Sequence, residues 1–182
     1  MMLIVSKHYR ESDALTALSE ALEKIICGSS LEPVFFCVGS DRHLLDSFGP
    51  LTGSMIKEQI PDVVVCGTLD DPLHARNLPL KVKEMQNDYP ASIKIAIDAS
   101  LGVHGEIGFI NLRQGPLLPG KAVARRLPPI GDYALTGVVG TYSHKDGNRV
   151  REPDGLANIY HLSQLVSAAV AKCCKNKTER EG

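Results

Sequence analysis

Three short, almost uninterrupted apolar runs constrain the fold of this chain more than any other feature. They cover Val34–Val38, Asp62–Gly67 and Ile93–Ile97. A helical pattern over about Leu51–Gln59 separates the first run from the second, and another that ends at about Asp88 separates the second from the third. Strands buried on both faces have this composition, because helices cover both sides of a parallel sheet. The order strand, helix, strand, helix, strand also requires right-handed crossovers. We therefore expect an α/β fold with three α/β/α layers and a mostly parallel central sheet.

The remaining segments add elements at both ends of this unit. A helix is expected over about Ala14–Cys27, strands over Glu106–Leu112 and Tyr133–Gly140, and a closing helix over Leu156–Lys172. Residues from about 175 to 182 are expected to form a flexible tail. The 182 residues are enough for one sizeable hydrophobic core, and no repeat or linker divides them. We therefore expect a single domain over the whole chain.

The composition excludes several classes of protein. A formal net charge of −1 is unfavourable for general binding to nucleic acid or to an anionic membrane. No stretch approaches the roughly 18 apolar residues that a membrane-spanning helix needs. Five cysteines without a Cys-x-x-Cys spacing fit neither a disulfide framework nor a zinc site, and they indicate a reducing compartment. We therefore expect a cytoplasmic protein with no nucleic-acid or membrane partner.

Two aspartates follow the first and third apolar runs. Asp46 ends a polar loop after Val38, and Asp98 directly follows Ile97. In the common strand order 2-1-3 the first and third strands are neighbours, so we expect both aspartates to face one crevice between the carboxyl ends. There they can share a proton and act on water as acid and base, or hold a divalent metal with a third ligand. An aspartate at a strand end also commonly caps the next loop without any role in chemistry.

Five further polar residues are expected near this crevice as second-tier substrate-binding groups. Three share the loop of Asp46, and two follow the second apolar run on the same rim of the sheet. They are Ser40, Asp41, Arg42, Asp71 and His74. Arg42 can hold a peptide carbonyl group, and His74 can titrate near neutral pH. A solvated loop and a helix-capping turn at Asp71-Pro72 explain the same residues without a function, and the turn is the stronger interpretation for Asp71.

Three motifs resemble those of a known group of proteases. VGSDRHLLDSFGP at Val38–Pro50 resembles the G-x-G-N…D-x-x-G-P loop of the spore germination proteases and the related loop of the hydrogenase maturation endopeptidases. AIDASLG at Ala96–Gly102 resembles their second motif, and GPLLPGKAVARR at Gly115–Arg126 resembles the H-P-G-x-G-V-G-N-R-R stretch of the germination proteases. Ser40 stands where these families have Asn, and Leu118 stands where the germination proteases have His. The chain also shares the GTLDDP and LTG segments of the YyaC-type sporulation proteases, so it resembles that family in particular.

This resemblance implies a phosphorylase/hydrolase-like fold and hydrolysis of peptide bonds in a protein or peptide substrate. It implies that Asp46 and Asp98 are the catalytic aspartates, acting in the cytoplasm of a sporulating cell or spore. The nickel-sensing maturation endopeptidases use a further His after the next strand, whereas this chain has no His within residues 105–143. Unless His104 or His144 substitutes, the resemblance implies a metal-free aspartic peptidase with no cofactor.

Three functions are consistent with these residues. The first is an aspartic-type endopeptidase of sporulation, a hydrolase in which Asp46 and Asp98 activate water. The second is a non-catalytic sporulation factor that binds a peptide or partner protein in the same crevice, which the departures at Ser40 and Leu118 favour. The third is a metal-dependent maturation endopeptidase, which needs a further ligand beside the two aspartates.

Overall fold

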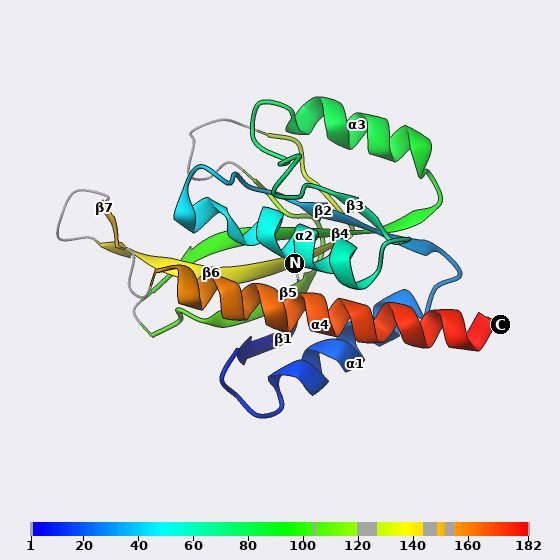
Figure 1. Cartoon of the computed structure of the whole chain (residues 1–182), viewed down its shortest axis with the longest axis horizontal. Coiled ribbons are helices and arrows are strands. Elements are labelled where there is room, and N and C mark those ends of the chain that lie inside the picture. Colours follow the sequence, from blue (N-terminus) through cyan, green and yellow to red (C-terminus); the bar gives the residue numbers. More distant parts are fainter. Residues whose placement is uncertain (1, 104, 120–126, 144–148, 152–154, 182) are drawn as a thin grey trace.

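The computed structural model of the chain describes residues 2–103, 105–119, 127–143, 149–151 and 155–181, and Figure 1 shows their arrangement. The strands are β1 (Met2–His8), β2 (Glu32–Cys37), β3 (Val64–Cys66), β4 (Ser92–Gly102), β5 (Phe109–Gln114), β6 (Tyr133–Ser143) and β7 (Arg149–Arg151). The helices are α1 (Ala14–Ile26), the short 3-10 helix η1 (Leu44–Asp46), α2 (Phe48–Gln59), α3 (Leu78–Asp88) and α4 (Leu156–Glu181). The described strands form one sheet in the order β1-β5-β6-β4-β2-β3, and β7 pairs with β6.

The central strands of this sheet are parallel. β2 pairs in parallel with β3 on one side and with β4 on the other, and β4 pairs in parallel with β6. β5 is antiparallel to both of its neighbours, β6 and β1. The first and third apolar runs are therefore adjacent, with Cys37 opposite Ile97. The predicted mostly parallel sheet is confirmed.

Both faces of β2 are buried, as its apolar composition predicts. Val34 and Phe36 belong to a core cluster with α3, whereas Phe35 and Cys37 belong to a larger cluster with α1, α2 and α4. All four of these residues are 0% exposed. Figure 1 shows α3 on one side of the sheet and α1 with α4 on the other. The predicted three-layer α/β/α architecture is confirmed.

The third expected strand is longer than its apolar run. β4 continues through Asp98 to Gly102 because β6 pairs with it along this stretch. The prediction that Asp98 closes the strand is therefore wrong. β2, however, ends at Cys37, opposite Ile97. Asp98 is thus the first residue of β4 beyond the end of β2, at the point where the neighbouring chain leaves the sheet.

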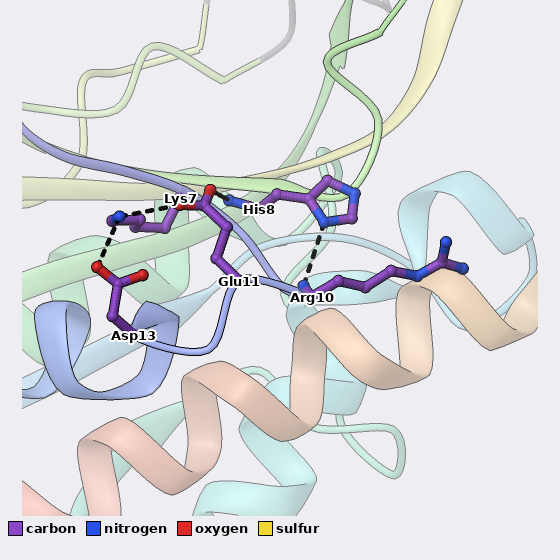
Figure 2. A network of polar contacts seen from close by, with 5 residues as sticks. All are labelled: Lys7, His8, Arg10, Glu11 and Asp13. Atoms are coloured by element: carbon purple, nitrogen blue, oxygen red, sulfur yellow. Dashed lines mark hydrogen bonds and ion pairs between the residues drawn. The ribbon is translucent and has the colours of Figure 1, made fainter.

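The amino-terminal residues form a strand that the sequence pattern does not predict. β1 is an edge strand whose partner, β5, lies far along the chain. Figure 2 shows the turn that follows it, in which the Lys7 ammonium contacts Glu11 at 2.9 Å and Asp13 at 2.8 Å. The other carboxylate oxygen of Glu11 accepts a hydrogen bond from the His8 N–H at 2.7 Å. These contacts hold the turn between β1 and α1.

The closing helix is also longer than predicted. α4 extends to Glu181, so the segment expected as a flexible tail is helical over most of its length. Within it, the Lys177 ammonium donates to Leu31 O at 3.0 Å and to Glu32 Oε1 at 2.7 Å, which ties the last turns of α4 to the start of β2. Although α4 has 26 residues, none of the described helices is both long and apolar enough to cross a membrane.

Smaller differences concern element boundaries. α2 begins at Phe48 and β5 begins at Phe109, each three residues from the predicted start. α3 begins at Leu78, with Pro79 in its first turn, where proline costs no backbone hydrogen bond. The end of the third motif, residues 120–126, lies outside the described residues.

Candidate active site

The carboxyl end of β2 is held on both sides. The Val38 N–H donates to a carbonyl oxygen of β4 at 2.7 Å, and the Gly39 N–H donates to Leu73 O at 2.9 Å. The Ser40 N–H then donates to Asp46 O at 2.9 Å, which closes the loop between them. Gly39 has a φ of +145°, and a Cβ atom there would lie 2.1 Å from Asp46 O. Glycine therefore allows the end of the strand to approach the backbone of Asp46 this closely.

An anchor in the core follows Asp46. Phe48 begins α2, and its side chain is 0% exposed. Its ring lies against Gly137 of β6, where an added Cβ atom would be 2.9–3.1 Å from three ring atoms. Gly137 stands opposite Ala99, the residue after the second aspartate. The anchor of the Asp46 loop thus rests on the strand pair that carries Asp98.

Asp98 has a strongly raised pKa. Its side chain is partly buried, and its Oδ1 accepts a hydrogen bond from the Ala99 N–H at 2.8 Å. The pKa of Asp98 is about 8, mainly because burial disfavours the charged carboxylate and secondly because of the charge of Asp46. The hydrogen bond from the Ala99 N–H acts in the opposite direction and lowers this pKa. The two carboxylates therefore lie close enough to interact electrostatically.

Asp46 is the more easily ionised member of the pair. Burial raises its pKa, whereas the imidazoles of His43 and His74 act in the opposite direction, because nearby positive charge favours a carboxylate. Asp46 is therefore the first of the two to lose its proton, and Asp98 retains its own near neutral pH. This arrangement places one acid and one base together, as the addition of water to a carbonyl group requires.

The second-tier residues beyond the Asp46 loop differ in their surroundings. The charge of His74 acts on Asp46. Asp71 is exposed, and its carboxylate forms an ion pair with Lys81 of α3. Its N–H donates to Thr68 Oγ1 at 3.2 Å. These contacts agree with the interpretation of Asp71 as part of a turn before a helix.

The residues of the Asp46 loop also differ from one another. Asp41 and Arg42 are exposed, and Ser40 Oγ accepts a hydrogen bond from the Arg42 N–H at 3.2 Å. Ser40 thus contributes to the turn of the loop. The loop residue whose charge acts on Asp46 is His43, which the sequence pattern does not single out. Its position in the same short loop is the signal by which it could have been found.

In the described part of the chain, no group of three or more His, Cys, Asp or Glu side chains is arranged to hold a metal ion. His104 and His144, the two alternatives for a third ligand, lie outside the described residues. The charges of His43 and His74 act on Asp46, and the charge of Asp46 acts on Asp98.

Comparisons with known proteins agree with this fold. The chain is 38% identical over 125 residues to the "Uncharacterized protein YyaC" of Bacillus subtilis (strain 168), and the match covers 68% of this chain and 60% of that protein's length. Among solved structures, it is similar to the NiFe hydrogenase maturation protease HycI from Thermococcus kodakarensis KOD1, with a TM-score of 0.58. That likeness has 19% identity and covers 85% of this chain and 99% of the other, and it shows a shared α/β fold.

A family model covers nearly the whole chain. It is described as "Protein of unknown function (DUF1256)", and it matches residues 6–169. This span contains both aspartates, the Asp46 loop and the strands that position them. The chain therefore belongs to the DUF1256 family.

Proposed function

We propose that this protein is a peptidase in which Asp98 is the general acid and Asp46 is the general base. The observation that carries the proposal is the raised pKa of Asp98, about 8, beside a carboxylate that ionises first. Near neutral pH the pair then holds one proton, as acid–base hydrolysis requires. The two aspartates have unlike roles because their surroundings differ.

The proposed reaction uses these two protonation states in turn. Asp46 takes a proton from water as the water oxygen bonds to the peptide carbonyl carbon, and Asp98 gives its proton to the carbonyl oxygen. When the C–N bond breaks, Asp46 passes its proton to the leaving amine, and Asp98 regains a proton from one hydroxyl group of the intermediate. Both aspartates thereby return to their starting states.

Three features support this proposal. The pair stands where β2 ends beside β4, the position at which parallel α/β sheets bind ligands. The close approach at Gly39 and the buried ring of Phe48 hold the Asp46 loop, and catalysis depends on such fixed positions. The fold is shared with a maturation protease, and the motifs resemble those of sporulation proteases. The proposal accordingly includes a protein or peptide substrate and a role in the cytoplasm of a sporulating cell.

The test is cleavage of a complex peptide mixture. The purified protein is incubated with peptides from a digest of a bacterial proteome, and new amino termini are identified by mass spectrometry. Asp46→Asn and Asp98→Asn should each lower the rate by about 100- to 10,000-fold, the usual contribution of a general acid or base. Asp88→Asn, which changes an exposed carboxylate at the end of α3, is the matched control and should cleave like the wild type. Undiminished cleavage by Asp98→Asn would refute the proposal.

One observation favours the non-catalytic alternative. Leu118 is 49% exposed and stands where the germination proteases have His, and an apolar side chain can bind a peptide but cannot transfer a proton. A sporulation factor that only binds would retain peptides from the same digest on immobilised protein and produce no new termini. In that case Leu118→Ser should weaken the retention of peptides.

A further inference from the structure

The turn before α3 holds His74 in a fixed position. Leu73 is 0% exposed and its carbonyl oxygen accepts the Gly39 N–H at 2.9 Å, so the residue before His74 is tied to the end of β2. The His74 N–H donates to Asn77 Oδ1 at 2.9 Å, and Asn77 Nδ2 donates to Pro72 O at 2.9 Å. The Asn77 side chain and the backbone thus make the hydrogen bonds of this turn, and the imidazole takes no part in them.

The two nitrogen atoms of the His74 ring are in different surroundings. Among the described residues, Nδ1 is a buried atom without a hydrogen-bond partner. The residue as a whole is only partly buried, and Nε2 is not among the buried unpaired atoms. A proton on Nδ1 would be a buried donor without an acceptor, which costs about 1–3 kcal/mol. An unprotonated Nδ1 would likewise be a buried acceptor without a donor, so Nε2 is the ring nitrogen that a bound molecule can reach.

The turn that carries His74 lies beside the end of β2, where the Asp46 loop begins, since Leu73 O accepts the Gly39 N–H and Asp46 O accepts the Ser40 N–H. The charge of His74 acts on Asp46, and the charge of Asp46 acts on Asp98. Among the described residues, the hydrogen bonds of His74 are made by its backbone N–H and carbonyl oxygen, so Nε2 can serve a bound molecule. Hydrolysis of a peptide bond needs a donor at the carbonyl oxygen, which becomes negative as water adds to the carbon.

We propose that His74 is a third catalytic residue, whose Nε2–H donates a hydrogen bond to the carbonyl oxygen of the peptide bond held at Asp46 and Asp98. The inference rests on the proposed function and extends it. His74 keeps its proton and forms no covalent bond; it stabilises the oxygen while Asp98 delivers its proton there. Loss of this donor should slow the chemical step more than it weakens substrate binding, because the interaction is strongest in the transition state.

The test compares three variants on a peptide that the wild type cleaves in the digest assay. His74→Ala should lower kcat by about 100- to 1,000-fold with little change in KM, as for other single oxyanion donors. His74→Gln keeps an N–H donor and should recover at least about tenfold of that loss. His43→Ala removes the other imidazole that acts on Asp46, so it separates the effect of charge from that of the donor, and its loss in kcat should be much the smaller. Thermal unfolding midpoints show whether any variant has lost its fold.

Two results would overturn this role in the kinetic experiment. One is an equal loss in His74→Gln and His74→Ala, and the other is a kcat of His74→Ala within about threefold of the wild type. Nitrogen-15 NMR of the His74 ring in the free protein is a second readout that needs no substrate: a proton on Nε2 supports the inference, and a ring protonated on Nδ1 alone overturns it. Unchanged cleavage by Asp98→Asn refutes the proposed function itself. Unchanged cleavage by His74→Ala alone refutes only the role of His74.

Discussion

The ring of Phe48 packs directly on the backbone of Gly137, which connects the start of α2 to the strand beside Asp98. A Cβ atom at Gly137 would lie 2.9–3.1 Å from three atoms of this buried ring. Phe48 is the first residue of α2 and lies two positions after Asp46. The contact therefore links the end of the Asp46 loop to the strand pair that carries Asp98, and a glycine in the strand leaves room for the ring.

Gly137→Ala should reduce both stability and activity. The added methyl group overpacks the site, so we expect the free energy of unfolding in urea to fall by about 1–3 kcal/mol. Peptide cleavage should fall as well, because the Asp46 loop must shift. The matched control is a double-mutant cycle with Phe48→Leu, in which the smaller side chain makes room and should reduce the effect of Gly137→Ala. Additive losses in the cycle would show that the contact with Phe48 is not the cause.

The raised pKa of Asp98 should make stability depend on pH. Its folded-state pKa of about 8 lies far above the ordinary value of about 3.9 for an aspartate in an unfolded chain. Between these values the folded state binds the additional proton, so the free energy of unfolding should fall as pH rises, by at most about 1.4 kcal/mol per pH unit. Asp98→Asn should make this slope smaller and leave the contribution of Asp46, whose pKa is also raised; urea unfolding at several pH values between about 4 and 8 measures the change.

The exposed Asp88 provides the control for this pH dependence. Asp88→Asn should keep the slope of the wild type, because this carboxylate is in water in both the folded and the unfolded state. A slope that persists unchanged in Asp98→Asn would assign the effect to another group.

Removal of the Asp46 charge should lower the pKa of Asp98. That charge is the second cause of the shift, after burial, so the pKa in Asp46→Asn should fall below about 8. It should stay above the ordinary value of about 3.9, because burial is retained. Carbon-13 NMR of the Asp98 carboxyl group during a pH titration measures this change. An identical titration curve in the variant would mean that the two carboxylates do not interact.

The central part of the fold could be predicted because it depends on local composition. A strand buried on both faces, such as Val34–Val38, must be apolar throughout, and the common strand order 2-1-3 then places it beside the strand of Asp98. β1 was missed because its partner lies far along the chain. The extension of β4 was missed because pairing with β6, and not apolar composition, carries it past Asp98.

The same distinction holds within the candidate site. The two aspartates follow recognisable apolar runs, so the sequence predicts that their carboxylates lie near each other. The roles of His43 and Gly137 depend on groups from elsewhere in the fold: the charge of His43 acts on the partly buried Asp46, and Gly137 lies against the ring of Phe48. In the sequence they are only a loop histidine and a strand glycine.

The turn after β1 should contribute little and in a salt-dependent way. Lys7→Met removes the contacts of Lys7 with Glu11 and Asp13, which join half-exposed side chains (Figure 2). Exposed ion pairs are weak and are screened by salt. We expect a small fall in the thermal unfolding midpoint at low salt and none in about 1 M NaCl, where the Debye length is about 3 Å. A fall of the same size at both salt concentrations would indicate that packing of the Lys7 side chain, and not its charge, stabilises the turn.

The tie between α4 and β2 should contribute more, because Lys177 is only 6% exposed. Its ammonium donates to Leu31 O at 3.0 Å and to Glu32 Oε1 at 2.7 Å. Lys177→Ala removes these charge-assisted bonds, so we expect the free energy of unfolding to fall by about 1–3 kcal/mol. Lys175→Ala, exposed on the same helix, is the matched control, with an expected change below about 0.5 kcal/mol.

Hydrogen exchange locates the effect of Lys177. In Lys177→Ala the backbone amides in the last turns of α4 should exchange faster, because local opening no longer breaks the contact with the start of β2. In Lys175→Ala these amides should exchange as in the wild type, since that side chain is exposed. If both variants lose equal stability and protection, the loss comes from a property that both lysines share, such as a positive charge near the carboxyl end of α4, and the tie to β2 does not hold the end of α4 in place.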